Sequence, residues 1–130
     1  MDAAQALADL TEISSQIVHA AVIGGDGAVL ASTFDDGERA GRFAEGVGRL
    51  VADADAVREA SGLPGLAQLE AATLDGSLFI VRGENGASIA AVTRPDPTVG
   101  LVFYDLKHAL RSIDETKPRA ARRRKTDAPA

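Results

Sequence analysis

The longest regular pattern in the sequence runs from Asp35 to Gly65 and predicts one amphipathic helix of about 25 residues. Bulky apolar side chains recur in it at intervals of three and four, which is the spacing of one helix face. They are Phe43, Val47, Leu50, Val51, Ala54 and Val57. Asp35 and Glu38 suit the start of this helix as a capping box, and Gly62 and Pro64 suit its end. At 1.5 Å per residue it would be about 38 Å long, so the rest of the chain must pack around it.

A second face of the same segment is lined by small residues at intervals of four. They are Ala40, Ala44, Gly48, Ala52 and Ala56. Small side chains let another helix approach closely, so this face predicts a contact with a second helix. A single helix that faces the core of an alanine-rich chain is the alternative interpretation of this stretch.

Five short apolar runs predict the strands of a sheet. They are residues 17–23, 28–32, 66–74, 77–82 and 87–93. Turn dipeptides that favour type I′ hairpins separate three pairs of these runs. They are Asp26-Gly27, Asp75-Gly76 and Asn85-Gly86. The third run carries Gln68 and Glu70, and its polarity predicts an edge strand.

Helical spacing of apolar residues predicts two further helices, over residues 2–14 and 95–113. Asp96 and Pro97 suit the start of the second, which we expect to end near Thr116. The order is α-β-β-α-β-β-β-α, an α/β chain of the α+β type. Two hairpin units joined by the long helix predict a mainly antiparallel five-stranded sheet of order 2-1-5-4-3. The long helix would cover one face alone, and the two terminal helices would cover the other.

Charge is distributed unevenly along the chain. Residues 117–130 hold six basic residues and one acidic residue, whereas the other 116 residues hold eight basic and eighteen acidic residues. We therefore predict one domain over residues 1–116 and a basic, disordered tail over residues 117–130. The tail either keeps the protein soluble or contacts an acidic partner or anionic lipid. Nucleic-acid binding is not expected, because the body is acidic and the tail lacks aromatic residues.

No set of residues is patterned for catalysis or for holding a cofactor. The sequence has no GxxxxGK(S/T) phosphate loop, no GxSxG turn and no cysteine. His19 and His108 fall in a predicted strand and a predicted helix, where we expect structural roles. Asp53 and Asp55 diverge on a helix, so we expect no metal site. These observations predict a protein that is not an enzyme and has no cofactor.

The sequence also predicts a cytoplasmic location. No apolar run approaches the roughly 18 residues that a transmembrane helix needs. The polar, acidic start of the chain does not resemble a signal peptide.

The order of elements and three stretches of sequence resemble the roadblock/dynein-light-chain family, whose fold is roadblock/profilin-like. The stretches are the hairpin Val22 to Ser32 with its Asp-Gly turn, the polar third strand after a Gly-Leu break, and PTVGLVFYDLKHALRSI (Pro97 to Ile113). The last of these looks like the closing helix of bacterial members. The resemblance covers residues 5–114, and the Arg-rich tail is not part of it.

The resemblance implies a non-enzymatic module that forms homodimers or heterodimers. In the family, the long helix pairs with its mate and the third strands join into one continuous sheet. Bacterial members typically bind small Ras-like GTPases as activators or scaffolds, so the implied partner is such a GTPase in a bacterial signalling system. The family has no shared catalytic residue, so the resemblance implies only an interface.

The residues support the same interface, because a long edge strand with few charges promotes association unless it is paired. A two-fold dimer would use the same patch on both copies. The predicted interface residues are Ala40, Ala44, Gly48, Ala52, Ala56, Leu66, Gln68, Leu69, Glu70 and Leu74. The alternative function is a PAS-like or longin-like sensor or scaffold that binds a small ligand or another protein. A sensor would need a pocket lined by aromatic residues, and the chain has only four Phe and one Tyr.

Overall fold

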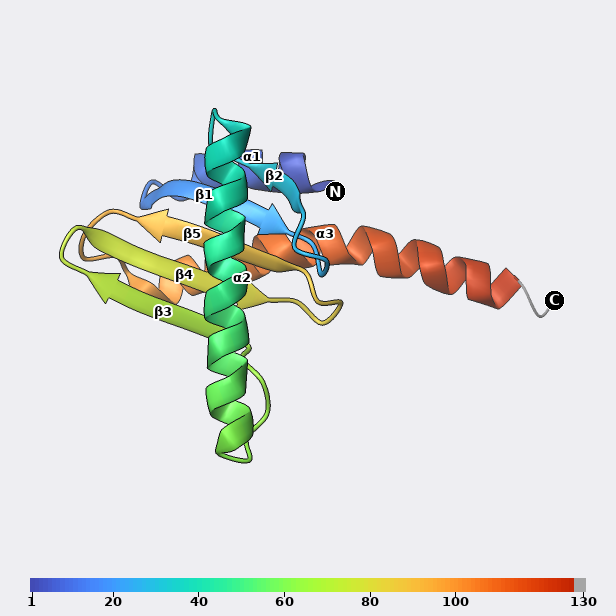
Figure 1. The fold of residues 1–130 in the computed structure, drawn as a ribbon. Helices are drawn as coiled ribbons and strands as arrows, with labels where there is room; N and C mark the ends of the chain where they lie inside the picture. The colour runs from blue at the N-terminus through green and yellow to red at the C-terminus, as the bar shows by residue number, and fades with distance from the viewer. Residues whose placement is uncertain (128–130) are drawn as a thin grey trace.

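The computed structural model describes the backbone from residue 1 to residue 127 and the side chains as far as Ile113. Three helices and five strands follow one another in this part of the chain, in the predicted order. They are α1 (Ala3–Ile13), β1 (Ile17–Ile23), β2 (Val29–Ser32), α2 (Gly37–Ala60), β3 (Gln68–Thr73), β4 (Gly76–Arg82), β5 (Ser88–Thr93) and α3 (Val99–Asp127). Figure 1 shows one layer of sheet with α2 running across it.

The sheet has the order β2-β1-β5-β4-β3, and all four strand pairs are antiparallel. This confirms the predicted topology. The first strand lies between β2 and β5, and its two faces are buried in different cores, with Ala20 and Val22 on the α1 and α3 side and Ala21 and Ile23 beneath α2. β2 and β3 are the two edges of the sheet.

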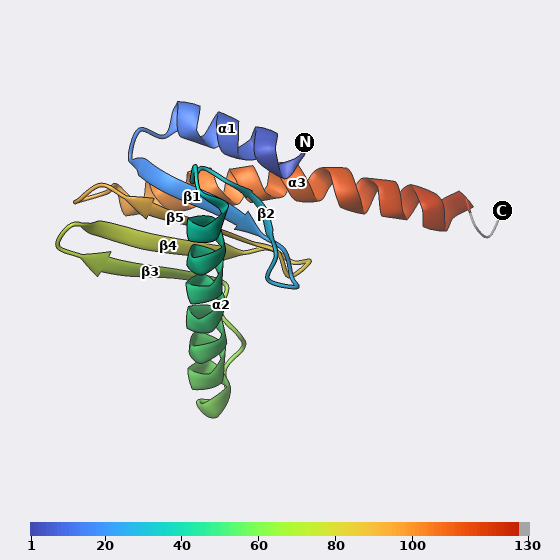
Figure 2. The ribbon, with the colours of Figure 1, turned by 45° about the horizontal axis from the view of Figure 1, so that its top comes forward.

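The larger core lies between the sheet and the helices α1 and α3. Figure 2 shows these two helices side by side on the face away from α2. Sixteen buried residues form this core, against six on the α2 face, so most of the folding energy belongs to the α1 and α3 side. Phe79 is fully buried there, and its ring meets that of Phe103 edge to face at 5.0 Å.

Two of the hairpin turns share one conformation, which is not the predicted type I′. A type I′ turn needs a positive φ at both central residues, yet Asp26 and Asn85 do not have one. Gly27 and Gly86 instead take a positive φ, of 89° and 90°, and close a turn that begins three residues earlier. The Asp26 and Asn85 side chains each accept a hydrogen bond from the amide two residues on, which stabilises the turn.

The turn between β3 and β4 is centred on Leu74-Asp75, one residue earlier than predicted. Gly76 begins β4 with a φ of 147°, and a Cβ at this position would lie 2.1 Å from the Thr93 carbonyl oxygen. Only glycine allows the start of β4 to approach the end of β5 so closely.

Helix ends differ from their predicted positions. Asp36, not Asp35, caps α2, because its carboxylate accepts a hydrogen bond from the Glu38 amide at 2.9 Å. Glu38 therefore lies in the first turn, where it faces Arg42 at 3.8 Å, and no capping box forms. Asp96 does not cap α3, because its φ is 55° and the helix begins three residues later.

The last helix runs through Lys117-Pro118 to Asp127, so the predicted end near Thr116 is wrong. Alanine and arginine fill residues 119–124 and are among the strongest helix formers, which favours continuation. Residues 117–127, which we expect to be disordered from the sequence, are therefore helical, and residues 128–130 lie outside the described part of the chain. The division into a domain and a separate basic tail stays a prediction.

Candidate protein–protein interface

The first half of α2 rests on the sheet through small side chains. Ala40, Ala44 and Val47 are each 4% exposed. Ala44 and Val47 pack in one cluster with Ala21, Ile23, Ile80 and Ala90 of the central strands. The small residues on both sides let the helix approach the sheet closely. Ala40 and Ala44 are thus covered within one copy of the chain, and their contact with a mate stays a prediction.

Two bulky residues predicted to face the sheet do not do so. Leu50 is 41% exposed and Val57 is 67% exposed. The face of α2 that meets the sheet is centred on Ala40, Val47 and Val51, so the Leu50 and Val57 side chains lie at its edge. Their exposure leaves an apolar flank along the helix, which we call the open flank.

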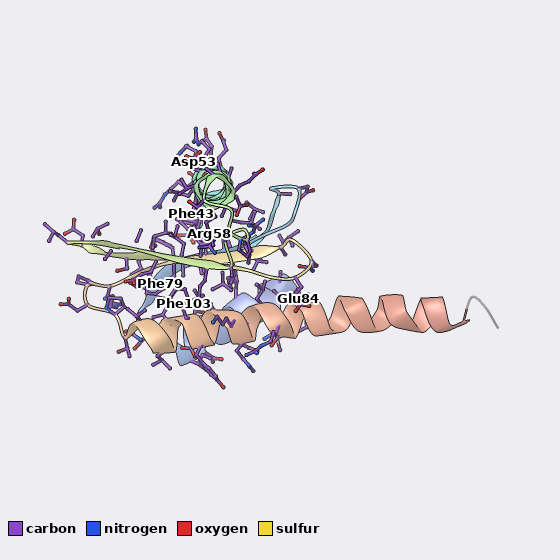
Figure 3. The ribbon with its side chains drawn as sticks, turned by 90° about the horizontal axis from the view of Figure 1, so that it is seen from below. Phe43, Asp53, Arg58, Phe79, Glu84 and Phe103 are labelled. Atoms are coloured by element: carbon purple, nitrogen blue, oxygen red, sulfur yellow. The ribbon has the colours of Figure 1, made fainter. Side chains whose placement is uncertain are left out.

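The open flank borders a shallow groove of about 450 Å³. Phe43, Gly46 and Leu50 of α2 line one wall, and Leu78 of β4 lies opposite. Figure 3 shows Phe43 directed from α2 toward the sheet and Asp53 directed away from it. Arg42, Arg49 and Asp53 make the rim of the groove polar. An apolar floor with a charged rim is typical of surfaces that bind protein.

The helix is longer than the sheet is wide. Its 24 residues extend about 36 Å. Five strands at about 4.8 Å spacing extend only about 19 Å from the first to the last. In Figure 1 the second half of α2 extends beyond β3, where this copy has no sheet to cover it. We call the end of the helix beyond Val51 the overhang, residues 52–60, because Val51 still packs on the sheet. A helix that reaches past its own sheet needs another surface beneath it.

An ion pair ties the overhang to the strand it passes. Arg82 Nη1 lies 2.9 Å from both carboxylate oxygens of Asp55, and it also donates to the Leu66 carbonyl at 3.1 Å. The Leu66 amide donates to Asp55 Oδ1 at 2.7 Å. The hydrogen bond from the Leu66 amide lowers the pKa of the Asp55 carboxyl, and the Arg82 charge lowers it further against partial desolvation. The carboxylate therefore holds α2, β4 and the loop before β3 together.

The edge strand β3 offers free backbone groups to a partner. The Arg82 amide donates to the Ala67 carbonyl, and bonded positions alternate in an antiparallel pair. Leu69, Ala71 and Thr73 therefore direct their backbone groups to β4. Those of Gln68, Glu70 and Ala72 are directed outward, away from the sheet, and Glu70 is the one charged residue among them.

The structure brings together only part of the predicted interface. Leu69 joins the cluster beneath α2, and Leu66 is held in the loop by its two backbone bonds. Six predicted residues are exposed. They are Gly48, Ala52 and Ala56 on α2, Gln68 and Glu70 on β3, and Leu74 in the turn. Asp55 on α2 is bonded to Leu66 of the loop that returns to β3, so the helix side that carries Asp55 faces this loop and not the groove. On a helical wheel Gly48 lies close to Asp55, and Ala52 and Ala56 follow it on this flank, away from the groove.

Sequence reasoning missed Leu78, Asp55 and Arg82 as parts of this surface. Asp55 and Arg82 are 27 residues apart, and no local spacing connects them. The apolar flank could have been found, because Leu50 and Val57 are one heptad apart and a helix stripe wider than one contact implies a second neighbour.

Two other kinds of site are absent from the described part of the chain. Among the described residues, no cluster of three His, Asp or Glu side chains is placed to hold a metal ion. None of the helices between residues 1 and 127 is long and apolar enough to cross a membrane.

No family model and no curated protein matches the chain by sequence. Solved structures match it closely in fold. A Roadblock/LC7 domain from Streptomyces avermitilis is 25% identical, with 84% of this chain and 95% of that domain aligned and a TM-score of 0.61. A second Roadblock/LC7 domain structure from that organism is 16% identical, with 89% and 98% aligned and a TM-score of 0.78.

The gliding protein MglB from Thermus thermophilus is 17% identical, with 85% of this chain and 84% of that protein aligned and a TM-score of 0.72. The chain therefore has the fold of Roadblock/LC7 domains and MglB, which confirms the resemblance inferred from the sequence.

Proposed function

We propose that this chain is a homodimeric, non-enzymatic interaction module of the bacterial cytoplasm that binds a small Ras-like GTPase and regulates or scaffolds it. The observation that carries the proposal is the unfinished α2 face, with its open flank, its overhang and the free edge of β3. The fold shared with MglB supports the GTPase partner by analogy. One MglB structure is described as a tetrameric arrangement, which supports self-association of this fold.

In the proposed dimer, the β3 strands of two copies join edge to edge about a two-fold axis. Each overhang then lies over the sheet of the other copy. The open flanks face one another, so Leu50 and Val57 leave water and the groove beside Leu78 is filled. We expect the contact to bury at least about 1,600 Å² in total, as stable protein interfaces do.

Charge selects the register of the two β3 strands. A two-fold axis at Glu70 would place two carboxylates directly opposite one another, which is destabilising. An axis at Leu69 would place Leu66 of one copy opposite Ala72 of the other, where the two backbones should hydrogen-bond. The Leu66 backbone groups are already bonded to Asp55 and Arg82. An axis at Ala71 avoids both costs, because it places Glu70 opposite Ala72 of the second copy.

This register can be tested by crosslinking, since the chain contains no cysteine. Facing residues at a non-hydrogen-bonded position have Cα atoms about 4.5 Å apart, within the range of a disulfide. Ala71→Cys should therefore form a disulfide-linked dimer under mild oxidation. Leu69→Cys is the matched control and should crosslink poorly. The reverse result would move the axis to Leu69.

Sedimentation velocity of the purified protein tests the dimer itself. We expect a dimer at tens of micromolar protein, and Leu50→Arg should weaken it at least about tenfold by placing a charge in the interface, about 1.4 kcal/mol. Ala52→Arg adds the same charge on the opposite flank and should leave the dimer intact. A monomeric wild-type protein would refute the dimer, and a selective effect of Ala52→Arg would restore the small-residue face as the contact.

Affinity capture tests the GTPase partner. The full-length protein is immobilised, and lysate of the native organism is applied with either GDP or a non-hydrolysable GTP analogue. We expect a small GTPase to be retained in one nucleotide state, and the purified GTPase to bind directly. A GTP hydrolysis assay with both purified proteins then separates an activator from a scaffold. Recovery of no GTPase in either state counts against the proposal while leaving the dimer untouched.

A further inference from the structure

A second concave surface lies on the opposite layer of the molecule, between α1 and α3. It is a cleft of about 280 Å³, and Figure 2 shows the two helices that form it side by side. Ala6, Leu10 and Ala109 give it an apolar floor. Asp9, Glu12 and Asp105 also line it, and we call this surface the acidic cleft.

Asp105 is a mostly buried residue whose carboxylate has no hydrogen-bond donor among the described side chains. It is 7% exposed, lines the cleft, and makes no hydrogen bond or ion pair with any described residue. Burial raises the pKa of its carboxyl, and the charge of His108, one turn further along α3, opposes this rise. Its oxygens are not among the fully buried side-chain atoms that lack a partner, so they open into the cleft, where a positively charged donor can reach them.

The other charges of the cleft do not supply that donor. The Asp9 carboxylate accepts a hydrogen bond from the Gln5 side-chain amide, and Glu12 has no partner among the described side chains. The Met1 amino group lies at the wall of the cleft, 3.5 Å from the Ser112 carbonyl. Three carboxylates thus face one ammonium group and a histidine, so the cleft attracts cations.

The chain itself contains a segment of matching charge. Residues 119–125 hold five basic residues and no acidic one. They follow the cleft on the same continuous helix, since α3 runs unbroken to Asp127. From Asp105 to Arg119 the helix rises about 21 Å, so this basic segment cannot reach the cleft of its own copy. In Figure 1 that end of α3 extends away from the body of the molecule.

We propose that two copies of the chain pair through antiparallel α3 helices, with the basic segment 119–125 of each lying in the acidic cleft of the other. The two-fold axis would cross α3 near residue 115, which fills both clefts at once. The composition of the segment suits the cleft, because its five basic residues complement the three carboxylates and Ala120 and Ala121 are small enough for the apolar floor. This contact uses the layer opposite α2 and so is separate from the dimer proposed above.

A charge-swap experiment tests this contact in the full-length protein by sedimentation velocity. The cleft variant is Asp9→Arg with Glu12→Arg, and the segment variant is Arg122→Glu with Arg123→Glu. All proteins carry Leu50→Arg, so that the α2 contact does not contribute. We expect salt-sensitive dimers of the parent protein, at least tenfold weaker association in each variant alone, and restored association when both pairs of changes are combined.

The control variant, Glu45→Arg with Glu84→Arg, makes the same change of net charge on α2 and in the β4–β5 turn. It should associate like the parent, because neither residue lines the cleft. Circular dichroism establishes that each variant remains folded. Unchanged association in the cleft and segment variants, or failure of the combined variant to restore it, would overturn the proposal. A monomeric parent protein at low salt would overturn the proposal as well. That outcome would hold even if the cleft bound a basic segment of another protein, because the proposed occupant is a second copy of this chain.

Discussion

The two faces of the sheet are buried to different extents within one copy of the chain. On the α1 and α3 face, sixteen buried residues form a closed core in which Phe79 and Leu106 are fully covered. On the α2 face, the buried cluster has only six residues, Leu50 and Leu78 line an open groove, and Val57 is exposed. One face therefore supplies most of the buried apolar surface of the single copy, and the other leaves apolar surface exposed.

Adjacent residues of β4 show how sharply the boundary falls. Phe79 is fully buried, whereas Leu78 points to the other face and lines the groove. In the proposed dimer, alternate residues of this one strand would therefore serve folding and association. The comparison predicts that substitutions on the α1 and α3 face disturb the folding equilibrium of the single copy. Substitutions on the α2 face should instead disturb its association with a second copy.

The largest effect is expected from Phe79→Ala, which should lower the free energy of unfolding by about 3–5 kcal/mol. The ring of Phe103 would lose its edge-to-face partner, and a cavity would remain in a core that cannot collapse. Leu78→Ala should lower the stability of the single copy far less, because its side chain is only half-buried. Urea unfolding at low protein concentration measures both. Equal losses would contradict the division between the faces.

A smaller effect concerns the dependence of stability on protein concentration. If a mate completes the α2 face, the wild-type midpoint of unfolding should rise with protein concentration, because binding adds about 2.7 kcal/mol to the free energy of unfolding at one hundred times the dissociation constant. In high salt, where the α3 contact proposed above is suppressed, Leu50→Arg should remove that dependence and leave the unfolding of the single copy almost unchanged, since its side chain is exposed. Thermal unfolding in high salt across a hundredfold range of protein concentration measures this change. A Leu50→Arg protein that still gains stability with concentration under these conditions would contradict the assignment of the groove.

The smallest effects are expected from two carboxyls whose pKa values shift in opposite directions. The pKa of Asp55 is lowered, so its contribution to stability is present above about pH 3.8 and is lost as the pH falls through its lower folded value. Asp55→Asn should be less stable than wild type at pH 7, with the difference shrinking in acid. Urea unfolding between pH 2.5 and 7 measures this change.

Asp105 should behave in the opposite sense. Its pKa is raised, so its favourable contribution is present below about pH 3.8 and is lost as the pH rises through its higher folded value. Asp105→Asn should therefore stabilise the single copy at pH 7, and this gain should disappear toward pH 3.5. A loss of stability at neutral pH would mean that donors within the same copy already satisfy the carboxylate.

Most of the fold could be predicted from the sequence, because local patterns determine it. The apolar run from Ile17 to Ile23 and the glycines after each hairpin turn indicated the strands and their order. Turn types and caps were less predictable, since Asp35 and Asp36 are equally suited to cap a helix and only packing selects between them. The helix continued past Pro118 because the residues after it favour helix.

The candidate interface was harder to predict than the fold. Its position on the long helix and the third strand followed from length and edge exposure, but its face did not. Ala40 and Ala44 look like a contact for a second helix, yet the sheet beneath them also consists of small residues, so the chain uses them itself. The tie between Asp55 and Arg82 depends on residues brought together only by folding.

That tie has a consequence for the speed of association. If the chain dimerises as proposed, the bonds of Arg82 and Leu66 to Asp55 hold the overhang and the edge strand in one relative position before the second copy binds. Little backbone entropy then remains to be lost in the encounter, and two copies can dock as rigid bodies. Pairing should occur in a single kinetic phase within the usual range of about 10⁵–10⁷ M⁻¹s⁻¹. Loosening the tie would leave a protein that pairs slowly, by first ordering its own edge.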